Sequence, residues 1–527
     1  MDKKRTDAKE FAFAGVVFTA VILALLAFLT MPDPNSLSAR PIGNVDLGSS
    51  PLDLSEDFES NFLKEDDAEP HPDQNSETLL VSTFGRGELR LKDGLPLLVL
   101  RGSFYDMGMQ YGFLAGSEIA AMLGVFDEIT EKESSGFLSR NIQIGVRRWL
   151  GKLFERHFPE SAQNMISGIR EGASLRGIDL NEHDLAFLNS VIDIAGIGST
   201  DLSFSSDGLG AVSALVGLIQ REVGASLIRQ NCNTFAAWGS RTHDGKTFQT
   251  RNTDIAVGLG LERHPLVYAA FPEDASGPLV PYVAAGFAGQ IGASTGMNAH
   301  GVALGQVWAF SRIKAIGSPW SLLMIDVMSQ AKSATEAADL LLASRPSPHT
   351  YGNNFVFADA VGDGVAVELN PHNSDRFRAA DPREASEAQM EDGRIWALPL
   401  RDAIVRADFS MSRKIRKDQT SAGGPQAYPP TAGSYRKRYA GQIKRILALE
   451  AMGRPIGVRE AMMISRATAD RNTGNIQLAV YANTDRRLWV SYASERRGVL
   501  RQAFENSFVL IPFDALLKGQ EATSPPD

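Results

Sequence analysis

The pattern of apolar residues changes at residue 232, and this change constrains the fold more than any other sequence feature. Three segments before it carry apolar residues at helical spacing: 103–126, 159–177 and 181–194. After it, strand-like segments follow one another, separated by turn signals such as "HDGK" at 243–246. Two helical segments, 321–344 and 441–452, lie among these strands. Helices first, then strands with further helices laid on them, predict a layered α+β architecture.

A run of twenty uncharged, mostly apolar residues, 11–30, lies near the N-terminus. A helix of this length spans the roughly 30 Å hydrocarbon core of a bilayer. Lysine and arginine are found in residues 1–10, on one side of the run, so we expect this tail in the cytoplasm and the remainder outside it, periplasmic or extracellular. The alternative is a signal peptide cleaved after Ala39, but the run is longer than the usual signal core.

Residues 31–79 are rich in proline, serine, aspartate and glutamate. Such a segment buries too little apolar surface to offset the entropy of ordering it, which predicts a disordered acidic linker. We divide the remaining chain into a helical region, a β-rich catalytic region and a disordered tail: 80–231, 232–518 and 519–527. The net charge of −9 argues against a nucleic-acid partner, because binding phosphates needs a basic surface.

Cys232 is the only cysteine in the chain. A single cysteine is often a small apolar core residue. Here, however, "RNTD" follows nineteen residues later, and a hairpin through 243–246 brings Arg251 and Asp254 beside Cys232. A guanidinium favours the reactive thiolate. A carboxylate opposes it unless it serves another cation, such as the α-amino group that a cut before Cys232 creates.

Such a cut releases Asn231 as the end of one chain and makes Cys232 the first residue of another. A terminal amine titrates at about 7.7–8.0, so it is a usable base near neutral pH. It activates a nucleophile on its own residue. The sequence around Cys232 therefore predicts a self-cleaving enzyme with a cysteine nucleophile.

Cys232, the hydroxyl residue Thr234 and the Arg-Asn-x-Asp of 251–254 resemble the start of the mature β chain in the N-terminal nucleophile hydrolases. The pattern is most similar to the group of acyl-coenzyme A:6-aminopenicillanic acid acyltransferase (peptidase C45) and the phospholipase B-like proteins. Choloylglycine hydrolases and acid ceramidases are more distantly similar. Four further regions resemble the same group in its order: 100–116, 167–179 with 188–190, 294–304 and 353–371.

The resemblance implies a four-layered αββα sandwich, cleavage between Asn231 and Cys232, and no cofactor or metal. It implies a small acyl substrate, an amide, an ester or an acyl-coenzyme A, that is attacked by Cys232 to form a thioester. Arg251 would stabilise the thiolate and position the substrate, and Asp254 would hold the amine.

The sequence departs from this group in places. Asp408 stands where relatives carry the asparagine that donates to the oxyanion, and an anion is a poor donor there. Other candidates for oxyanion or substrate contacts are side chains with donor groups: Asn353, Asn354, Asn252 and Thr234. A late arginine of the group has no clear counterpart among Arg486, Arg487, Arg496 and Arg497.

Two alternatives stay open. A Cys–His thiol hydrolase needs no cleavage, because its partners meet in space rather than in sequence. The eight histidines are scattered without metal-ligand spacing, and we expect His243 and His300 to face solvent. An exported protein that only binds an acyl ligand is the other alternative. The basic clusters 413–417 and 435–439 are interpreted as solvated faces, or as sites for an acidic substrate group or lipid headgroups.

Overall fold

The computed structural model describes residues 78–133, 140–198, 231–309, 311, 313–344, 349–387, 397–419, 438–472 and 474–521. All of these belong to one compact unit, Leu52–Asp527. The predicted basic tail, the anchor at 11–30 and nearly all of the linker lie outside the described residues. Within the described ranges, no helix combines the length and the apolar character that crossing a bilayer requires.

The larger sheet has eleven strands in the described part of the chain. In chain order these are β1 (Thr78–Phe84), β2 (Gly87–Lys92), β3 (Leu95–Gly102), β6 (Pro265–Asp274), β7 (Gly277–Pro278), β8 (Tyr282–Phe287), β9 (Gly296–Asn298), β10 (Ala303–Trp308), β11 (Asn353–Ala358), β12 (Gly364–Leu369) and β13 (Ser374–Arg378). They pair in the order β1-β2-β3-β6-β8-β9-β10-β11-β12-β13, with β7 on β6. The β3–β6 pair is parallel, so segments on both sides of residue 232 build one sheet.

The smaller sheet pairs its strands antiparallel in the order β14-β4-β5-β15-β16-β19. Their bounds are β4 (Asn231–Ala237), β5 (Phe248–Asp254), β14 (Ala403–Ala407), β15 (Gln477–Ala482), β16 (Arg487–Tyr492) and β19 (Val509–Ile511). A separate two-stranded sheet is formed by β17 (Ser494–Arg496) and β18 (Val499–Arg501). The predicted β-rich character of the chain after residue 232 is confirmed.

The described helices are α3 (Phe104–Glu133), α4 (Arg140–Glu155), α5 (Glu160–Ser174), α6 (Glu182–Gly198), α8 (Trp320–Gln330), α9 (Ala334–Ala343), α10 (Arg383–Glu387), α11 (Arg413–Arg416), α12 (Ala440–Ala451), α13 (Val458–Thr468) and α14 (Phe513–Glu521). The predicted helix at 321–344 is two helices, because Ser333 leaves the helical conformation and its side chain accepts the N–H of Glu336 to cap α9. Four short 3₁₀ turns complete the set: η3 (Gly239–Arg241), η4 (His243–Gly245), η5 (Leu261–Arg263) and η7 (Ala503–Glu505).

Close backbone packing joins α3 to α5. A Cβ added at Gly112 would lie 2.0 Å from the carbonyl oxygen of Ile169, and one at Gly172 would lie 2.0 Å from that of Met109. Glycine is therefore required on both helices, because a side chain at either position would clash with the backbone of the other helix. The pair rests on β3 of the larger sheet through α3.

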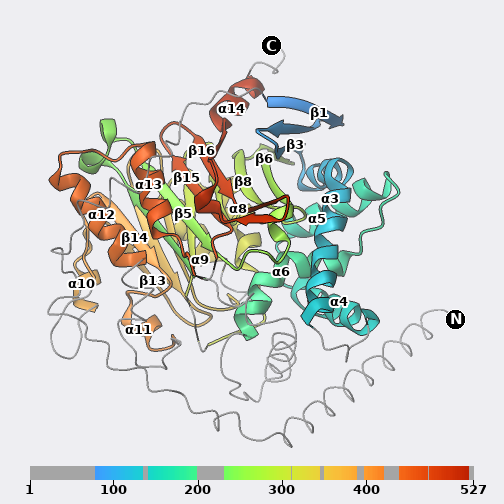
Figure 1. The fold of residues 1–527 in the computed structure, drawn as a ribbon, viewed down its shortest axis with the longest axis horizontal. Helices are drawn as coiled ribbons and strands as arrows, with labels where there is room; N and C mark the ends of the chain where they lie inside the picture. Colours follow the sequence, from blue (N-terminus) through green and yellow to red (C-terminus); the bar gives the residue numbers. More distant parts are fainter. Residues whose placement is uncertain are drawn as a thin grey trace, which may run out of the picture. The chain divides into compact units, whose positions relative to one another are not determined.

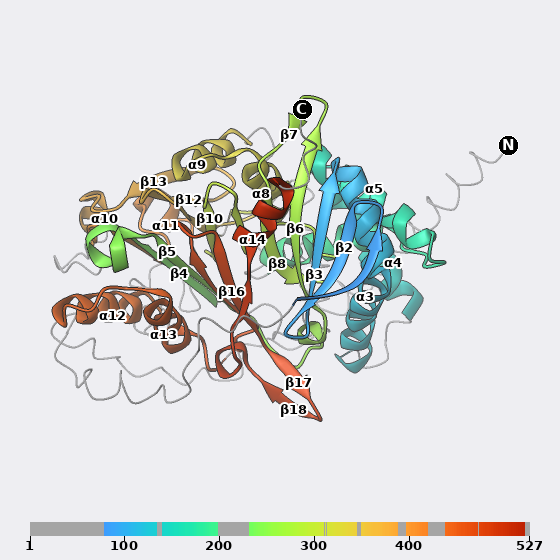
Figure 2. The same cartoon turned by 90° about the horizontal axis from the view of Figure 1, so that it is seen from above.

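The two sheets lie face to face, with helices on their outer sides (Figures 1 and 2). Helices α8 and α9 pack on the larger sheet, and α13 packs on β5 and β15 of the smaller sheet. Between the sheets, a Cβ on Gly305 would lie 1.9 Å from Thr234 Oγ1, and Gln249 Nε2 donates to the carbonyl of Val356 at 2.9 Å. The mixed α+β class predicted from the sequence is confirmed.

Candidate active site

Strands β4 and β5 form the predicted antiparallel hairpin, joined through η3 and η4. Asn231 lies opposite Asp254, Cys232 opposite Thr253, and Thr234 opposite Arg251. Because side chains alternate along a strand, Cys232, Thr234 and Arg251 face the larger sheet, whereas Asp254 faces the helices. The short connection between two strands is what brings residues nineteen and more positions apart to one strand end.

Cys232 is only 2% exposed. Burial raises the pKa of its thiol, and the Arg251 guanidinium opposes this rise. The Asp254 carboxylate raises the pKa further, while hydrogen bonds with the backbone of Asp254 and Trp308 lower it. The thiol is therefore mainly protonated near neutral pH, and the charged groups that act on it are Arg251 and Asp254.

Arg251 is buried between the sheets and held by neutral groups. Its Nε donates to the carbonyl of Gln306 at 3.1 Å and its Nη2 donates to Gln306 Oε1 at 3.0 Å. Nη1 donates to Thr295 Oγ1 at 2.6 Å and also to Thr253. Among the described residues no carboxylate pairs with this guanidinium, so its charge is left to act on the thiol or on an anionic reaction intermediate.

Asp254 is fully buried, on the face of β5 opposite to the one that carries Arg251. Its Oδ1 accepts hydrogen bonds from the backbone N–H of Asp470 at 3.1 Å and from Asn475 Nδ2 at 2.8 Å. Its Oδ2 has no hydrogen-bond partner among the described residues and lies 3.8 Å from Arg438 Nε. Burial raises the pKa of Asp254 to about 7, against the influence of Arg438. One carboxylate oxygen is thus available for a further donor.

The guanidinium of Arg438 lies close to three carboxylates. Its Nη2 lies 2.5 Å from Asp470 Oδ2, its Nη1 lies 3.1 Å from Asp408 Oδ2, and Asp254 completes the group. The arginine is only 6% exposed, so for Arg438 the predicted solvated face at 435–439 is wrong: the three buried acids draw the side chain inward. The guanidinium of Arg438 is thus shared by three buried carboxylates.

Sequence reasoning missed Arg438 as a site residue. Of the late arginines considered instead, Arg486 donates to backbone carbonyls and Arg487 lies near Asp514. The sequence holds only an indirect signal for Arg438. Asp408 follows a strand-like segment and Asp470 follows a helical one, and an acid that is buried at such a place requires a cation nearby.

Asn353 and Asn354 are adjacent on β11 but are bound differently. Asn353 Oδ1 accepts from Gln306 Nε2 at 2.6 Å, and its buried Nδ2 has no partner in the described part of the chain. Asn353 also lies opposite Trp308, whose backbone contacts the Cys232 thiol. Asn354 Nδ2 instead donates to the carbonyls of Ala407 and Phe409, at 3.0 and 2.8 Å. Asn353 therefore has a donor to spare, and Asn354 has none.

The other two donor candidates are also occupied. Asn252 Nδ2 donates to the carbonyl of Ser465 at 2.8 Å, and Ser465 Oγ donates back at 2.5 Å, so this side chain binds α13 on the far face of β5 from Arg251. Thr234 Oγ1 donates to the carbonyl of Thr250 at 2.5 Å. The hairpin thus brings Cys232, Arg251 and Asp254 together, and it directs Asn252 away from the thiol.

Asp408 directly follows β14, where Ala407 pairs with Asn233 of β4. The two carbonyls that Asn354 binds flank Asp408 on either side, and its side chain points to Arg438. This residue therefore contributes charge to the buried cluster in the place where the resemblance leads one to expect an amide.

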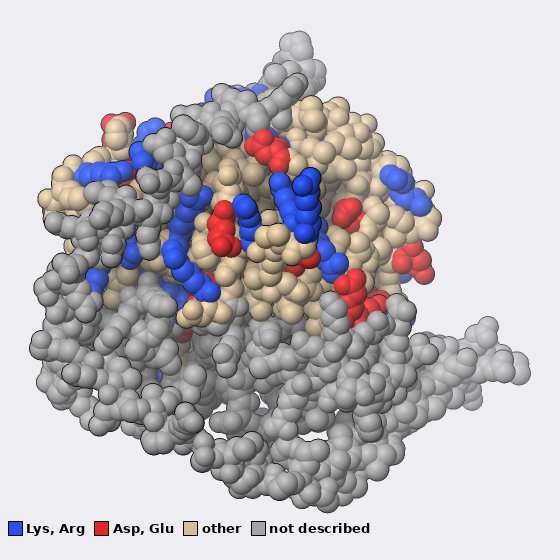
Figure 3. Space-filling model, viewed as in Figure 1, with Lys and Arg blue, Asp and Glu red and all other residues tan. Residues whose placement is uncertain are grey.

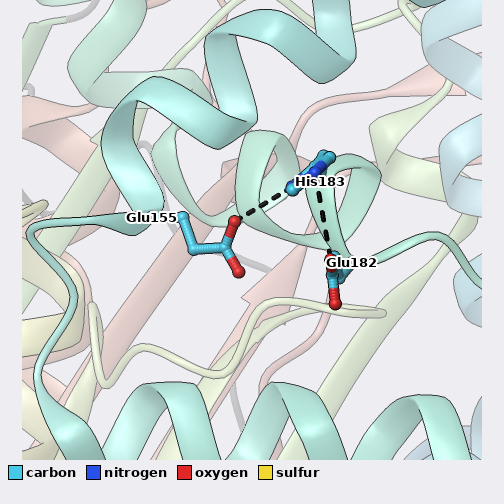
Figure 4. A group of neighbouring side chains, drawn as sticks. All are labelled: Glu155, Glu182 and His183. Carbon is cyan, nitrogen blue, oxygen red and sulfur yellow. Dashed lines mark hydrogen bonds and ion pairs between the residues drawn. The ribbon is translucent and has the colours of Figure 1, made fainter. Parts of the chain in front are cut away.

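One group of described residues has the composition of a metal site: Glu155, Glu182 and His183. His183 lies between the two carboxylates, with Nδ1 2.9 Å from Glu155 and Nε2 3.9 Å from Glu182 (Figure 4). Only the Nδ1–Glu155 contact is within hydrogen-bond distance. The turn histidines His243 and His300 are exposed, as predicted.

A family model supports the resemblance drawn from the sequence. The model of acyl-coenzyme A:6-aminopenicillanic acid acyl-transferase matches residues 240–391, which hold Arg251, Asp254 and Asn353. A curated relative, an uncharacterized protein of Archaeoglobus fulgidus, is 26% identical over 226 residues, which are 41% of this chain and 33% of the relative. The chain therefore spans about a third of that relative's length.

Three solved structures align with about half of this chain. An N-acylethanolamine-hydrolyzing acid amidase ortholog of Caenorhabditis elegans is 15% identical over 53% of this chain and 100% of its own, with a TM-score of 0.32. Penicillin V acylase from Agrobacterium tumefaciens is 13% identical over 50% and 83%, with a TM-score of 0.32. Conjugated bile acid hydrolase from Clostridium perfringens is 13% identical over 52% and 93%, with a TM-score of 0.30. Because these TM-scores are low, only the geometry of the site and the family match bear on function.

Proposed function

We propose that the protein is an N-terminal nucleophile amidohydrolase or acyltransferase with the four-layered αββα sandwich, and that Cys232 is its nucleophile. The family match supports acyl chemistry. The observation that carries the assignment is the end of the β4–β5 hairpin, where the thiol lies between an unpaired guanidinium and a buried carboxylate with a spare oxygen.

The enzyme matures by cutting itself between Asn231 and Cys232. The Cys232 sulfur attacks the carbonyl carbon of Asn231 and the peptide C–N bond breaks, which leaves a thioester and a free amine. The proton of the thiol passes to the leaving nitrogen, and we assign Asp254, which pairs with Asn231 in the ladder, the role of stabilising the amine that forms there. Water then opens the thioester, which gives the Asn231 carboxylate and restores the thiol.

The new α-amine then acts as the base of the catalytic cycle. It takes the thiol proton, and the sulfur attacks the acyl carbonyl of the substrate. It returns the proton to the leaving amine, alcohol or thiol as the thioester forms. Water or an acceptor amine resolves that thioester by the same steps. Asp254 holds the ammonium form through Oδ2, which has no hydrogen-bond partner in the described part of the chain, and Arg251 stabilises the thiolate.

Asn353 supplies the donor for the oxyanion, because Asp408 stands in the position where relatives carry an asparagine for this purpose. Its Nδ2 is buried and has no hydrogen-bond partner among the described residues, and Asn353 lies opposite Trp308, whose backbone contacts the thiol. A preorganised donor of this kind in a buried site stabilises the developing charge strongly, because little solvent competes for it. Asp408 serves the charge cluster of Arg438 instead.

The substrate is a small acyl amide, acyl ester or acyl-coenzyme A, and no step requires a cofactor or metal. The apolar run at 11–30 anchors the protein in a membrane, with the catalytic part outside the cytoplasm. A reporter fused after residue 80 tests this topology, because reporter activity in the cytoplasm would reverse the orientation.

Gel separation and N-terminal sequencing of the purified protein test the proposal. We expect two fragments, one that ends at Asn231 and one that begins at Cys232. A screen over N-acyl amides, acyl esters and acyl-coenzyme A then identifies the substrate class. A single intact chain with full turnover would instead indicate the Cys–His hydrolase, and a protein without turnover on any acyl compound would indicate a binding protein.

A further inference from the structure

A short hairpin formed by β17 and β18 stands apart from the two large sheets. It pairs with no other strand among the described residues. Its turn uses Arg497 and Gly498, both with positive φ (53° and 75°), which is the geometry of a tight hairpin turn. Figure 2 shows the hairpin projecting from the body of the molecule. An isolated two-stranded hairpin is only marginally stable in water, so the stability of this hairpin depends on what packs against its two faces.

The hairpin combines exposed aliphatic side chains with unpaired arginines. Val499 is 58% exposed and Leu500 is 41% exposed. The side chains of Arg496, Arg497 and Arg501 are exposed, and none forms a hydrogen bond or ion pair with a described residue. Glu495 is the one acid in the hairpin, so the segment carries a charge of +2 on a chain whose net charge is −9.

The strand register sorts these side chains onto two faces. Arg496 lies opposite Val499 and Ser494 lies opposite Arg501, so these residues share one face. Glu495 and Leu500 share the other face, which turns to the body: a Cβ added at Gly258 would lie 3.2 Å from Leu500. The face directed to solvent is therefore basic with an aliphatic side chain at its centre.

We propose that this face of the β17–β18 hairpin docks on the surface of a bilayer that contains anionic phospholipids. Guanidinium groups match phosphate oxygens in pairs and are weakly hydrated, which favours contact with headgroups. Val499 enters the boundary between headgroups and acyl chains, where exposed aliphatic groups are stabilised. On the face drawn in Figure 3, basic side chains gather near the centre, where the hairpin projects toward the viewer.

Docking would place the proposed catalytic site close to the lipid surface. After β18 the chain enters η7, whose Phe504 N–H donates to Asn475 Oδ1 at 3.1 Å, and Asn475 in turn binds Asp254. The hairpin is thus attached to the residue that positions Asp254. The docking itself does not depend on the chemistry of Cys232, so the two proposals stand or fall separately.

A dye attached to the hairpin tests the proposal in the full chain. Cys232→Ala combined with Val499→Cys leaves the new thiol as the sole one, and it is labelled with an environment-sensitive fluorophore. The protein is reconstituted in vesicles of phosphatidylcholine alone or of phosphatidylcholine with phosphatidylglycerol. We expect a blue shift of the emission only in the vesicles with phosphatidylglycerol, and a loss of the shift in concentrated salt, which screens exposed charges.

Two triple variants decide whether the arginines cause the shift. Arg496→Gln/Arg497→Gln/Arg501→Gln should abolish it. The matched control, Arg156→Gln/Lys332→Gln/Arg401→Gln, removes three exposed charges from other elements and should keep it. Unchanged emission with phosphatidylglycerol, an equal shift in neutral vesicles, or a full shift in the hairpin variant would each overturn the proposal.

Discussion

Asn231 and Asp254 lie directly opposite each other in the ladder of β4 and β5. The peptide bond between Asn231 and Cys232 is therefore next to a carboxylate that is fully buried and keeps one oxygen without a hydrogen-bond partner among the described residues. An unsatisfied buried oxygen is unfavourable in the uncut chain. A cut before Cys232 supplies an ammonium group at this place, which is the partner that the oxygen lacks.

Cys232→Ala should give one intact chain, whereas the wild type should give two fragments. The reason is that no other thiol exists to attack Asn231. Thr234→Ser is the control. It keeps a hydroxyl group at the same position of β4, so this variant should still be cut. The fragments are separated on a denaturing gel and their termini are sequenced. Cleavage of Cys232→Ala at the same bond would remove Cys232 from the maturation reaction.

Asn353→Ala and Asn354→Ala form a matched pair that separates catalysis from folding. Removal of an oxyanion donor costs roughly 10²–10³-fold in kcat, so Asn353→Ala should lose turnover of this order with a nearly unchanged thermal midpoint. Asn354→Ala removes two buried hydrogen bonds, to the carbonyls of Ala407 and Phe409, and should mainly lower the thermal midpoint. The reverse pattern would show that Asn353 is structural.

Asp254→Asn should lower turnover by roughly 10²–10⁴-fold, since the charge that holds the amine is lost. The pKa of Asp254 rises from 3.8 to about 7, so the folded chain holds this proton more tightly than the unfolded chain. The corresponding stability is present at low pH and is lost as the pH rises from about 4 to about 7. Asp254→Asn should flatten this part of the plot of unfolding free energy against pH.

Asp359→Asn is the control for Asp254→Asn. Asp359 is also buried, but it accepts backbone N–H groups at the other end of β11 from Asn353. This variant should destabilise the fold and leave turnover per folded molecule unchanged. If Asp254→Asn behaves in the same way, Asp254 has a structural role only.

Arg438→Gln and Asp470→Asn should shift the acidic limb of the pH–rate profile in opposite directions. The Arg438 charge lowers the pKa of Asp254, so its removal moves the limb to higher pH. The Asp470 charge raises that pKa, so its removal moves the limb to lower pH. Both variants disturb the same ion pair, and a purely structural effect would lower stability in both without opposite shifts. Turnover of any accepted acyl substrate over the pH range provides the measurement.

Asn475→Ala should also move the acidic limb to higher pH, because its Nδ2 donates to Asp254 at 2.8 Å and favours the ionised form. Asn483→Ala provides the comparison. Asn483 is equally buried and donates to the carbonyls of Gly301 and Ala358, so its loss should reduce stability only. Identical pH profiles for the two variants would mean that Asn475 does not position Asp254.

The local parts of the site could be predicted from the sequence. Cys232, Arg251 and Asp254 belong to two strands joined by a short connection, so pairing at one strand end follows from the turn and the period of two alone. Such features depend on residues close in sequence.

The functions of distant residues were decided by tertiary structure. Asn353 and Asn354 are the same residue type and are adjacent in sequence. Only the tertiary contacts show that Asn353 Nδ2 has no partner among the described residues, whereas Asn354 Nδ2 binds the carbonyls of Ala407 and Phe409. Arg438 lies more than two hundred residues after Cys232, in a cluster that resembles any exposed basic segment. The sequence alone determined the hairpin that pairs β4 with β5, because this pairing follows from the turn signal and the local periodicity. The fold decided which charges surround Asp254, because burial and the contacts between distant segments set them.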